Sequence, residues 1–273
     1  MKRLIQWINA LPIWRSCWRI MSMEFYAPTL DRAIYLALHK LRLFGSGEKR
    51  LLEHLVREGQ HVLDIGANVG YYTCILAKCV TASGQVTAFE PMPQMQEALR
   101  CVVERNGLTW VTVCPVALSD TDGEVEMAAR SCNSGDFRVH VGGEWRVPVR
   151  RGDGIIKTGQ VDFIKIDVQG YEVPVLNGIR QILERSHTVK ILFEYWPKGL
   201  EMAGYSPAAM VACLEVHGFD LYRILNPARL VRIPWAEIDR HCQPRPWGAC
   251  ANFVATRGAG DTILFKMGKE IHE

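Results

Sequence analysis

The sequence predicts an α/β protein built on a mostly parallel, doubly wound sheet. Three observations support this prediction. From residue 60 onward, short apolar runs alternate with helical segments, which is typical of parallel strands joined by helices on both faces of a sheet. The first apolar run, 61–65, leads into a glycine-containing turn and then a helix. An acidic residue, Glu90, ends the next run, at the edge where open α/β sheets bind ligands.

The elements follow one another in a regular order. Short apolar runs bounded by turn residues are expected to form strands, and longer segments with helical spacing are expected to form helices. The strands are expected at 61–65, 85–90, 110–116, 161–167, 189–194, 219–224 and 252–256. The helices are expected at 71–80, 93–106, 173–185 and 207–217. Pro174 lies in the first turn of the third helix, where proline is tolerated.

Residues 119–150 depart from this alternation. Ser119-Asp120-Thr121-Asp122-Gly123 has the composition of a turn, residues 124–129 alternate like a strand, and residues 146–149 resemble a second strand. We therefore expect an inserted hairpin, or a small lid, before the fourth strand of the sheet.

The N-terminal part differs in charge from the rest of the chain. Residues 1–57 carry ten Lys or Arg against four Asp or Glu, whereas the remainder is net acidic by three. We expect three segments: a helical, basic and Trp-rich N-terminal extension at 1–57, an α/β domain at 58–258, and a C-terminal tail at 259–273. Within the extension, residues 28–57 look helical in two pieces. A basic extension on a mildly acidic domain suggests that the extension has a partner of its own.

Tryptophan and basic residues concentrate in residues 1–23, which contain no acidic residue. Trp7, Trp14 and Trp18 belong to a series with helical spacing, although Pro12 would interrupt a helix. A helix of this composition suits either a membrane interface or a packing surface on the α/β domain. No apolar run is long enough to span a bilayer. We expect a cytoplasmic protein, with residues 1–23 as a candidate peripheral contact at the inner face of a membrane.

The first strand and its turn, Asp64-Ile65-Gly66-Ala67-Asn68-Val69-Gly70, form a candidate cofactor cradle. Gly66 and Gly70 allow the backbone to approach a ligand closely, ahead of the N–H groups at a helix start. A dinucleotide fingerprint has a glycine where this chain has Asn68, whose amide would crowd a pyrophosphate but can bind a zwitterionic amino acid. Asp64 adds a negative charge near the expected α-amino group. These features favour S-adenosylmethionine over a nicotinamide dinucleotide.

Two further positions complete the expected cofactor site. Glu90 ends the second strand, where an acid can accept hydrogen bonds from both ribose hydroxyls. Val116-Ala117-Leu118-Ser119 ends the third strand, where small and apolar side chains suit an adenine. We expect the cofactor to be bound by Asp64, Gly66, Ala67, Asn68, Gly70, Glu90 and Ala117.

Four motifs resemble the FkbM-type methyltransferases in order and spacing. They are Asp64-Ile65-Gly66-Ala67-Asn68-Val69-Gly70, Phe89-Glu90-Pro91, Ala117-Leu118-Ser119-Asp120 with Gly123, and Phe163-Ile164-Lys165-Ile166-Asp167-Val168-Gln169-Gly170-Tyr171-Glu172. The last motif is the most specific, and the resemblance covers residues 50–200. It implies a class I Rossmann-like methyltransferase that uses S-adenosylmethionine and O-methylates a hydroxyl of a sugar, polysaccharide or natural product. The family often has Glu where this chain has Gln169, which puts a metal or base role at that position in doubt.

Methyl transfer to a hydroxyl requires aligned oxygen, carbon and sulfur atoms, and a base within hydrogen-bond reach assists it. Asp167 follows the fourth strand, beside the methyl position that the fold implies, so we predict it as the base or as the acceptor that orients the hydroxyl. Lys165 shares a strand face with Asp167, and the two are expected to pair, either for catalysis or as a structural ion pair. Glu194 ends the fifth strand and is predicted to reach the same cleft. The catalytic candidates are therefore Asp167, Lys165 and Glu194.

Neighbouring side chains suggest two further features. Tyr195 and Trp196 would form an apolar wall of the kind on which sugars stack. Asp167, Glu172 and Glu194 carry enough oxygen atoms for a divalent cation, but no His joins them and their spacing is not that of a metal motif. We predict no bound metal.

The expected acceptor is a small-molecule or glycan hydroxyl. No amino-methylation motif follows the fourth strand, and the α/β domain lacks the basic surplus that tracks phosphates, so we expect no nucleic-acid partner. A nucleic-acid methyltransferase on the same fold and a non-catalytic cofactor-binding or scaffold module remain the alternatives. The sequence does not specify the oligomeric state.

Overall fold

The structure is a computed structural model of the 273-residue chain. It describes residues 16–20, 23–27, 46–129, 137–157, 159–226, 229–245 and 248–258.

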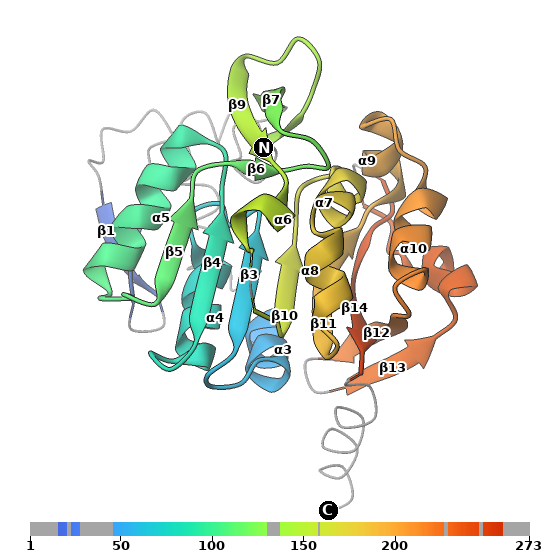
Figure 1. The fold of residues 1–273 in the computed structure, drawn as a ribbon, viewed down its shortest axis with the longest axis horizontal. Coiled ribbons are helices and arrows are strands. Elements are labelled where there is room, and N and C mark those ends of the chain that lie inside the picture. Colours follow the sequence, from blue (N-terminus) through green and yellow to red (C-terminus); the bar gives the residue numbers. More distant parts are fainter. Residues whose placement is uncertain are drawn as a thin grey trace, which may run out of the picture.

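A mostly parallel sheet forms the centre of the protein (Figure 1). Within the described residues it has eight strands in the order β13-β12-β14-β11-β10-β3-β4-β5. Their bounds are β3 (His61–Ile65), β4 (Gln85–Phe89), β5 (Val111–Cys114), β10 (Phe163–Ile166), β11 (Val189–Tyr195), β12 (Asp220–Asn226), β13 (Arg229–Ile233) and β14 (Ala251–Arg257). The strands from β5 to β11 are parallel, whereas β14 runs antiparallel between β11 and β12. The chain winds outward from β3 to β5 and returns at β10, so the winding reverses beside β3, where open α/β sheets bind ligands.

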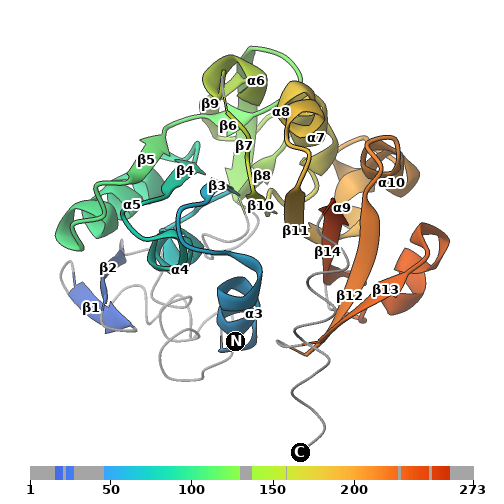
Figure 2. The same cartoon turned by 60° about the horizontal axis from the view of Figure 1, so that its bottom comes forward.

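Helices cover both faces of this sheet, as predicted (Figures 1 and 2). One face carries α3 (Ser46–Leu55), α4 (Tyr71–Val80) and α5 (Pro93–Arg105), and the other carries α6 (Gly152–Ile155), α7 (Glu172–Gly178), α8 (Arg180–Arg185), α9 (Pro197–Met202) and α10 (Pro207–Glu215). Side chains alternate between the two faces along each strand. In β3, Val62 joins the cluster with α3 and α4, whereas Leu63 and Ile65 join the cluster with α7 and α8.

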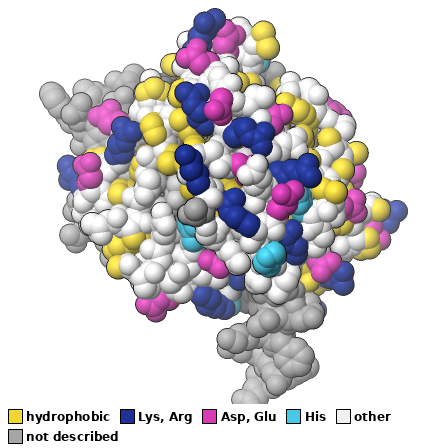
Figure 3. All heavy atoms as spheres, in the orientation of Figure 1, with side chains coloured by type: hydrophobic (Ala, Val, Ile, Leu, Met, Phe, Trp, Pro, Cys, Tyr) yellow, Lys and Arg dark blue, Asp and Glu magenta, His cyan; other side chains and the backbone are white. Residues whose placement is uncertain are grey.

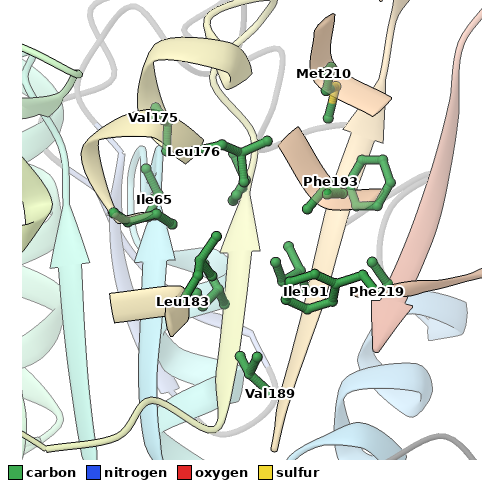
Figure 4. Close-up of a cluster of buried hydrophobic side chains, with 14 of the residues drawn as sticks. Ile65, Val175, Leu176, Leu183, Val189, Ile191, Phe193, Met210 and Phe219 are labelled. Carbon is green, nitrogen blue, oxygen red and sulfur yellow. The ribbon is translucent and has the colours of Figure 1, made fainter. Parts of the chain in front are cut away.

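The larger of the two cores lies under α7, α8 and α10 (Figure 4). Its fully buried members include Ile65 of β3, Ile191 and Phe193 of β11, and Val175 and Leu183 of the covering helices. Burying an aliphatic or aromatic side chain of this size contributes about 1.5–3 kcal/mol. This packing holds the strands in register and so fixes the positions of the loops that leave their carboxyl ends.

The predicted insertion is present as a second, small sheet with the strand order β6-β9-β7-β8. Its strands are β6 (Ala117–Leu118), β7 (Gly123–Ala129), β8 (Phe137–Val139) and β9 (Trp145–Arg150). In Figure 1 it projects beyond the carboxyl ends of the parallel strands. Its apolar side, with Met127 and Val147, packs against Val69, Met92 and Met95. The insert is therefore seated directly on the turn that follows β3.

Several elements differ from the predictions. The third strand stops at Cys114, and the chain resumes at Ala117 as β6 of the small sheet, where it pairs with β9. The helix expected over 173–185 is divided at Ile179 into α7 and α8, and Gly178, at the end of α7, packs against the backbone of Ser119. A Cβ on Gly178 would lie 1.9 Å from the Ser119 carbonyl oxygen. The edge strand β13 and the 3₁₀ helix η3 (Trp235–His241) had no clear sequence signal.

The described residues of the N-terminal extension include both helix and strand. The second expected helical piece is present as α3, and the first lies outside the described residues. The helical conformation expected for the series that contains Trp18 is wrong at that residue, because β1 (Ser16–Ile20) is extended and pairs with β2 (Met23–Ala27) in an antiparallel hairpin. Backbone hydrogen bonds between the two strands replace those of a helix. The tail from residue 259 onward lies outside the described residues.

Charges are mixed on the face shown in Figure 3, where Lys and Arg side chains form a broken band below the insert with acidic side chains between them. Among the helices that the structure describes, none combines the length and apolar character needed to cross a bilayer. The membrane contact predicted for residues 1–23 falls mostly outside the described part of the chain and stays a prediction.

Candidate active site

The turn after β3 forms the cradle that the sequence predicts. Gly66, Asn68 and Gly70 have φ angles of 82°, 52° and 90°, so the backbone adopts left-handed conformations at alternate positions. The N–H groups of Gly66 and Ala67 both donate to the carbonyl oxygen of Phe89, at 3.0 Å each. Gly70 then caps the start of α4. These contacts fix the turn to the end of β4, beside Glu90.

Glu90 is joined to the cradle by its carboxylate. Its Oε2 accepts a hydrogen bond from the backbone N–H of Asn68 at 2.8 Å, and its Oε1 accepts one from Met92 at 2.8 Å. Burial raises the pKa of Glu90 to about 7, and the two backbone hydrogen bonds oppose that shift. A carboxylate oxygen can accept more than one hydrogen bond. Glu90 therefore holds the turn with both oxygens, and its predicted contact with a ribose stays a prediction.

Asn68 uses its side chain within the turn. Its Oδ1 accepts a hydrogen bond from the backbone N–H of Val69 at 2.7 Å. An asparagine tolerates the left-handed conformation better than most residues, partly because such a local hydrogen bond stabilises it. Asn68 thus shapes the cradle in this structure, and the predicted contact of its amide with an amino-acid moiety stays a prediction.

Beneath the turn lies a buried charge network. The Lys165 Nζ is 3.6 Å from Asp64 Oδ1 and 3.5 Å from Asp167 Oδ2, and it lies 4.6 Å from the ring centre of Tyr72. Thr73 donates a hydrogen bond to Asp64 Oδ2 at 2.7 Å. Burial raises the pKa of Asp64, whereas the Lys165 charge and the Thr73 hydrogen bond lower it. The predicted Lys165–Asp167 pair is present, and Asp64 is its third member.

These three side chains differ in access to solvent. The Asp64 side chain is fully buried and that of Lys165 is 5% exposed, whereas that of Asp167 is 38% exposed. Asp167 is therefore the one carboxylate of this network that is accessible to solvent. Asp64 lies inside the protein, where Lys165 and Thr73 bind its two oxygens, and its predicted contact with the cofactor stays a prediction.

Gln169 connects Asp167 with Glu194. Its Nε2 donates to Asp167 Oδ1 at 2.9 Å and to Glu194 Oε2 at 3.1 Å. The backbone of Gln169 has a φ of 54°, which turns the chain back toward these partners. Burial, followed by the Asp167 charge, raises the pKa of Glu194 to about 7. The Gln169 side chain thus brings the Asp167 and Glu194 carboxylates together, and a site role for Glu194 stays a prediction.

Glu172, at the start of α7, is a further buried acid behind this loop. Its Oε1 accepts a hydrogen bond from the Gly170 N–H at 3.1 Å, while Oε2 has no hydrogen-bond partner among the described residues. Burial raises the pKa of Glu172 to about 8. Among the described residues, no cluster of His, Cys, Asp and Glu has the makeup to hold a metal ion.

The chain's similarity to known proteins identifies its family. The family described as "Methyltransferase FkbM domain" matches residues 64–221, which span the cradle, Glu90, the insert and the Asp167–Glu194 pair. The chain belongs to the FkbM methyltransferase family. As in this family, its methyl donor is S-adenosylmethionine.

Curated relatives of this FkbM methyltransferase match over part of its length. "Hexuronic acid methyltransferase AglP" of Haloferax volcanii is 29% identical over 147 residues, which are 50% of this chain and 59% of that protein. "Protein-L-isoaspartate O-methyltransferase" of Methanocella arvoryzae is 38% identical over 58 residues, which are 21% of this chain and 31% of that protein. The chain thus spans less than two thirds of the length of either relative.

Solved structures with a similar fold are distant in sequence. A SAM-dependent methyltransferase from Aquifex aeolicus is 19% identical, with a TM-score of 0.45 over 80% of this chain and 92% of that one. A SAM-dependent O-methyltransferase from Thermotoga maritima is 16% identical, with a TM-score of 0.41 over 89% of this chain and 77% of that one.

The residues present in the FkbM methyltransferase fit S-adenosylmethionine. In the turn from Gly66 to Gly70, the backbone can come close to a bound cofactor because the two glycines carry no side chain. The Glu90 carboxylate lies beside this turn, at the end of the neighbouring strand. Ala117 lies in β6, paired with Val149 of β9, and takes no part in the hydrogen bonds around Glu90. An adenine contact at Ala117 therefore stays a prediction.

Sequence reasoning placed two aromatic residues incorrectly and missed a basic one. Tyr195 is buried in the core and its hydroxyl donates to Asp239 at 3.0 Å, so it does not form a sugar-stacking wall. Trp196 is also buried, with the guanidinium carbon of Arg138 4.9 Å from its ring centre. Arg138 had no signal in the sequence, because the short strand β8 that carries it was not predicted.

Proposed function

We propose that this FkbM methyltransferase O-methylates a sugar hydroxyl, with Asp167 as the general base. One observation carries the proposal. The backbone of Asp167 packs against the cradle, because a Cβ on Gly66 would lie 2.0 Å from the Asp167 carbonyl oxygen. The Asp167 side chain is nevertheless 38% exposed. An exposed carboxylate beside a cofactor turn is in the right place to receive a proton from an acceptor.

The cofactor residues are proposed to act in three groups. Gly66, Ala67 and Gly70 provide the close backbone approach, and Asn68 shapes the turn. Glu90 accepts hydrogen bonds from the ribose hydroxyls. Ala117 borders the adenine, and Asp64 contributes negative charge from beneath the turn.

The reaction requires the protein to align the reacting atoms and to remove the proton of the acceptor hydroxyl. S-adenosylmethionine supplies an electrophilic methyl group on a sulfonium sulfur. Asp167 accepts the acceptor's hydroxyl proton as the new oxygen–carbon bond forms and the carbon–sulfur bond breaks. Lys165 fixes one oxygen of Asp167 and Gln169 fixes the other, so the carboxylate is held in a single orientation. Glu194 positions Gln169 and borders the acceptor.

The acceptor class is supported by the relative from Haloferax volcanii, whose name specifies a hexuronic acid. We therefore propose a uronic acid, as a free sugar or within a glycan, as the acceptor. The match covers 50% of this chain and 59% of that relative, so the identity of the sugar is part of the proposal.

The proposal is tested by Asp167→Asn, assayed with labelled S-adenosylmethionine and a panel of methyl glycosides. Asparagine keeps the size and the hydrogen bond but is not a base, so we expect methyl transfer to fall about 10²- to 10⁴-fold, with cofactor affinity unchanged. Asp220→Asn is the matched control, because Asp220 is also paired with a basic residue, Arg232, and is 41% exposed. Full activity in Asp167→Asn would contradict the assignment.

A further inference from the structure

The helices α3 and α4 pack against each other (Figure 2), and a cavity of about 330 Å³ lies between them. This volume is at the lower end of the range for small-molecule pockets, about 300–1,000 Å³. Cys79 lines the cavity from the last turn of α4, whereas Tyr71, the first residue of that helix, follows the predicted cofactor turn. The two ends are ~12 Å apart along the helix axis. The cavity is therefore separate from the proposed active site.

The inner wall of the cavity is apolar. Val56, Cys74 and Ile75 line it, and each is at most 2% exposed. All three belong to the core cluster that joins α3 and α4 to the sheet. Burial raises the pKa of the Cys74 thiol to about 12, so this side chain stays neutral and behaves as a small hydrophobe. An apolar group of a ligand gains free energy by displacing water from such a wall.

Charged side chains form the rim of the cavity. Lys49, Arg57 and Lys78 contribute three positive charges, whereas Glu53 and Glu58 contribute two negative ones. The Lys49 Nζ lies 3.4 Å from Glu53 Oε1, and these two side chains are 36% and 46% exposed. An exposed pair of this kind is weak, so it does not hold the rim closed. The rim has one more positive than negative charge, which favours an anionic ligand group.

Arg57 is the rim residue best suited to bind that group. Its Nη1 donates to the carbonyl oxygens of Glu53 and Val56, at 2.9 Å and 3.3 Å, where α3 ends. Its Nε and Nη2 make no hydrogen bond within the described part of the chain, and the residue is exposed to solvent. The bonds at Nη1 orient the guanidinium. The edge formed by Nε and Nη2 matches a carboxylate through two parallel hydrogen bonds.

We infer that the cavity between α3 and α4 binds a small amphipathic carboxylate. The carboxylate pairs with Arg57 at the rim, and a short apolar chain lies against Val56, Cys74 and Ile75. The charge of the rim selects the head group and the apolar wall selects the chain, so neither half alone binds as tightly as the whole. This site is additional to the proposed methyl transfer and does not depend on it.

The test uses the half-exposed thiol of Cys79, which lines the cavity, as its readout. Burial raises the pKa of this thiol to about 11, so the full chain is labelled with N-ethylmaleimide at mildly alkaline pH. The labelling of each cysteine is followed by mass spectrometry. Octanoate at ten times its dissociation constant should slow the labelling of Cys79 by about 10-fold. Cys101, a half-exposed cysteine of α5, is the internal reference and should react at an unchanged rate.

Two probes and two variants resolve the chemistry. Octanol has the chain without the charge and acetate has the charge without the chain, so both should protect Cys79 much less than octanoate does. Arg57→Gln removes the charge and the paired N–H edge and should abolish the protection by octanoate. Arg50→Gln is the matched control, because Arg50 is an exposed arginine of the same helix that does not line the cavity. Melting temperatures verify that both variants are folded.

Protection by octanoate that is lost in Arg57→Gln and kept in Arg50→Gln supports the site. The inference is overturned if octanoate does not protect Cys79, if octanol or acetate protects it equally well, or if protection persists in Arg57→Gln. The three probes are compared on the unmodified chain, so this part of the test does not depend on the folding of any variant.

Discussion

Asp167 occupies the space that a side chain on Gly66 would need, because a Cβ there would lie 2.0 Å from the Asp167 carbonyl oxygen. The two residues follow the neighbouring parallel strands β3 and β10, and the Asp167 N–H donates to Ile65 at 3.0 Å. The cofactor turn and the candidate base are therefore built as one backbone unit. A change in either one displaces the other.

This contact predicts that Gly66→Ala abolishes cofactor binding. Two effects combine at this position: the left-handed φ of 82° and the collision with Asp167. Gly159→Ala is the control, because Gly159 has a φ of 81° but nothing within 4 Å of the added Cβ. The strain of a left-handed alanine alone costs about 1–2 kcal/mol. Calorimetry with S-adenosylmethionine should show no binding for Gly66→Ala and ordinary binding for Gly159→Ala, and equal binding by the two would refute the steric explanation.

Removing Lys165 should destabilise the fold. Lys165→Met leaves Asp64 fully buried without its cation, and breaking a buried ion pair costs about 3–5 kcal/mol. Urea unfolding measures this loss. The double variant Lys165→Met with Asp64→Asn removes the uncompensated charge and should recover most of the stability. A single variant as stable as the parent would show that the pair contributes little.

Stability should fall as the pH rises through neutrality. The pKa of Glu172 is about 8 and those of Glu90 and Glu194 are about 7, all above the ordinary value of 4.5 because of burial. The native state therefore binds more protons than the unfolded chain between pH 4.5 and 8, so the free energy of unfolding decreases across this range. Glu172→Gln keeps the hydrogen bond from Gly170 and should flatten the upper part of the curve. A Glu172→Gln curve parallel to that of the parent would contradict the assignment.

Gln169→Glu should make the site sensitive to pH. A glutamate cannot donate to Asp167 and Glu194 as the amide does, and it places a third carboxylate between them. We expect methyl transfer and the melting temperature to drop at pH 8 and to recover partly near pH 5.5, where carboxyl groups take up protons. Gln181→Glu, on the exposed side of α8, is the control. Equal pH profiles for the parent and Gln169→Glu would mean that the bridge has no role.

Much of the fold could be predicted from the sequence because its signals are local. Buried parallel strands appear as apolar runs in the sequence. The turn from Gly66 to Gly70 combines two glycines and an asparagine between a strand and a helix, which is typical of a cofactor turn. The ends of the parallel strands share one edge, so Asp167 and Glu194 could be expected to meet. The pairing of Lys165 with Asp167 followed from their spacing on one strand.

The remainder depends on contacts between distant segments. Asp64 joins Lys165 because β3 and β10 are neighbours in register, which the order of strands in the sequence does not specify. Gly178, at the end of α7, packs against Ser119, which follows β6 and is distant in the sequence. Arg138 reaches Trp196 only because the insert folds back over the sheet, and a three-residue strand such as β8 has no recognisable pattern.

The most direct test is a crystal structure of the protein with S-adenosylmethionine bound. We predict that both ribose hydroxyls lie within hydrogen-bond distance of the Glu90 carboxylate and that the methyl group faces the Asp167 side chain. A nucleoside bound away from the turn after β3, or a methyl group directed away from Asp167, would contradict the proposed site and its chemistry.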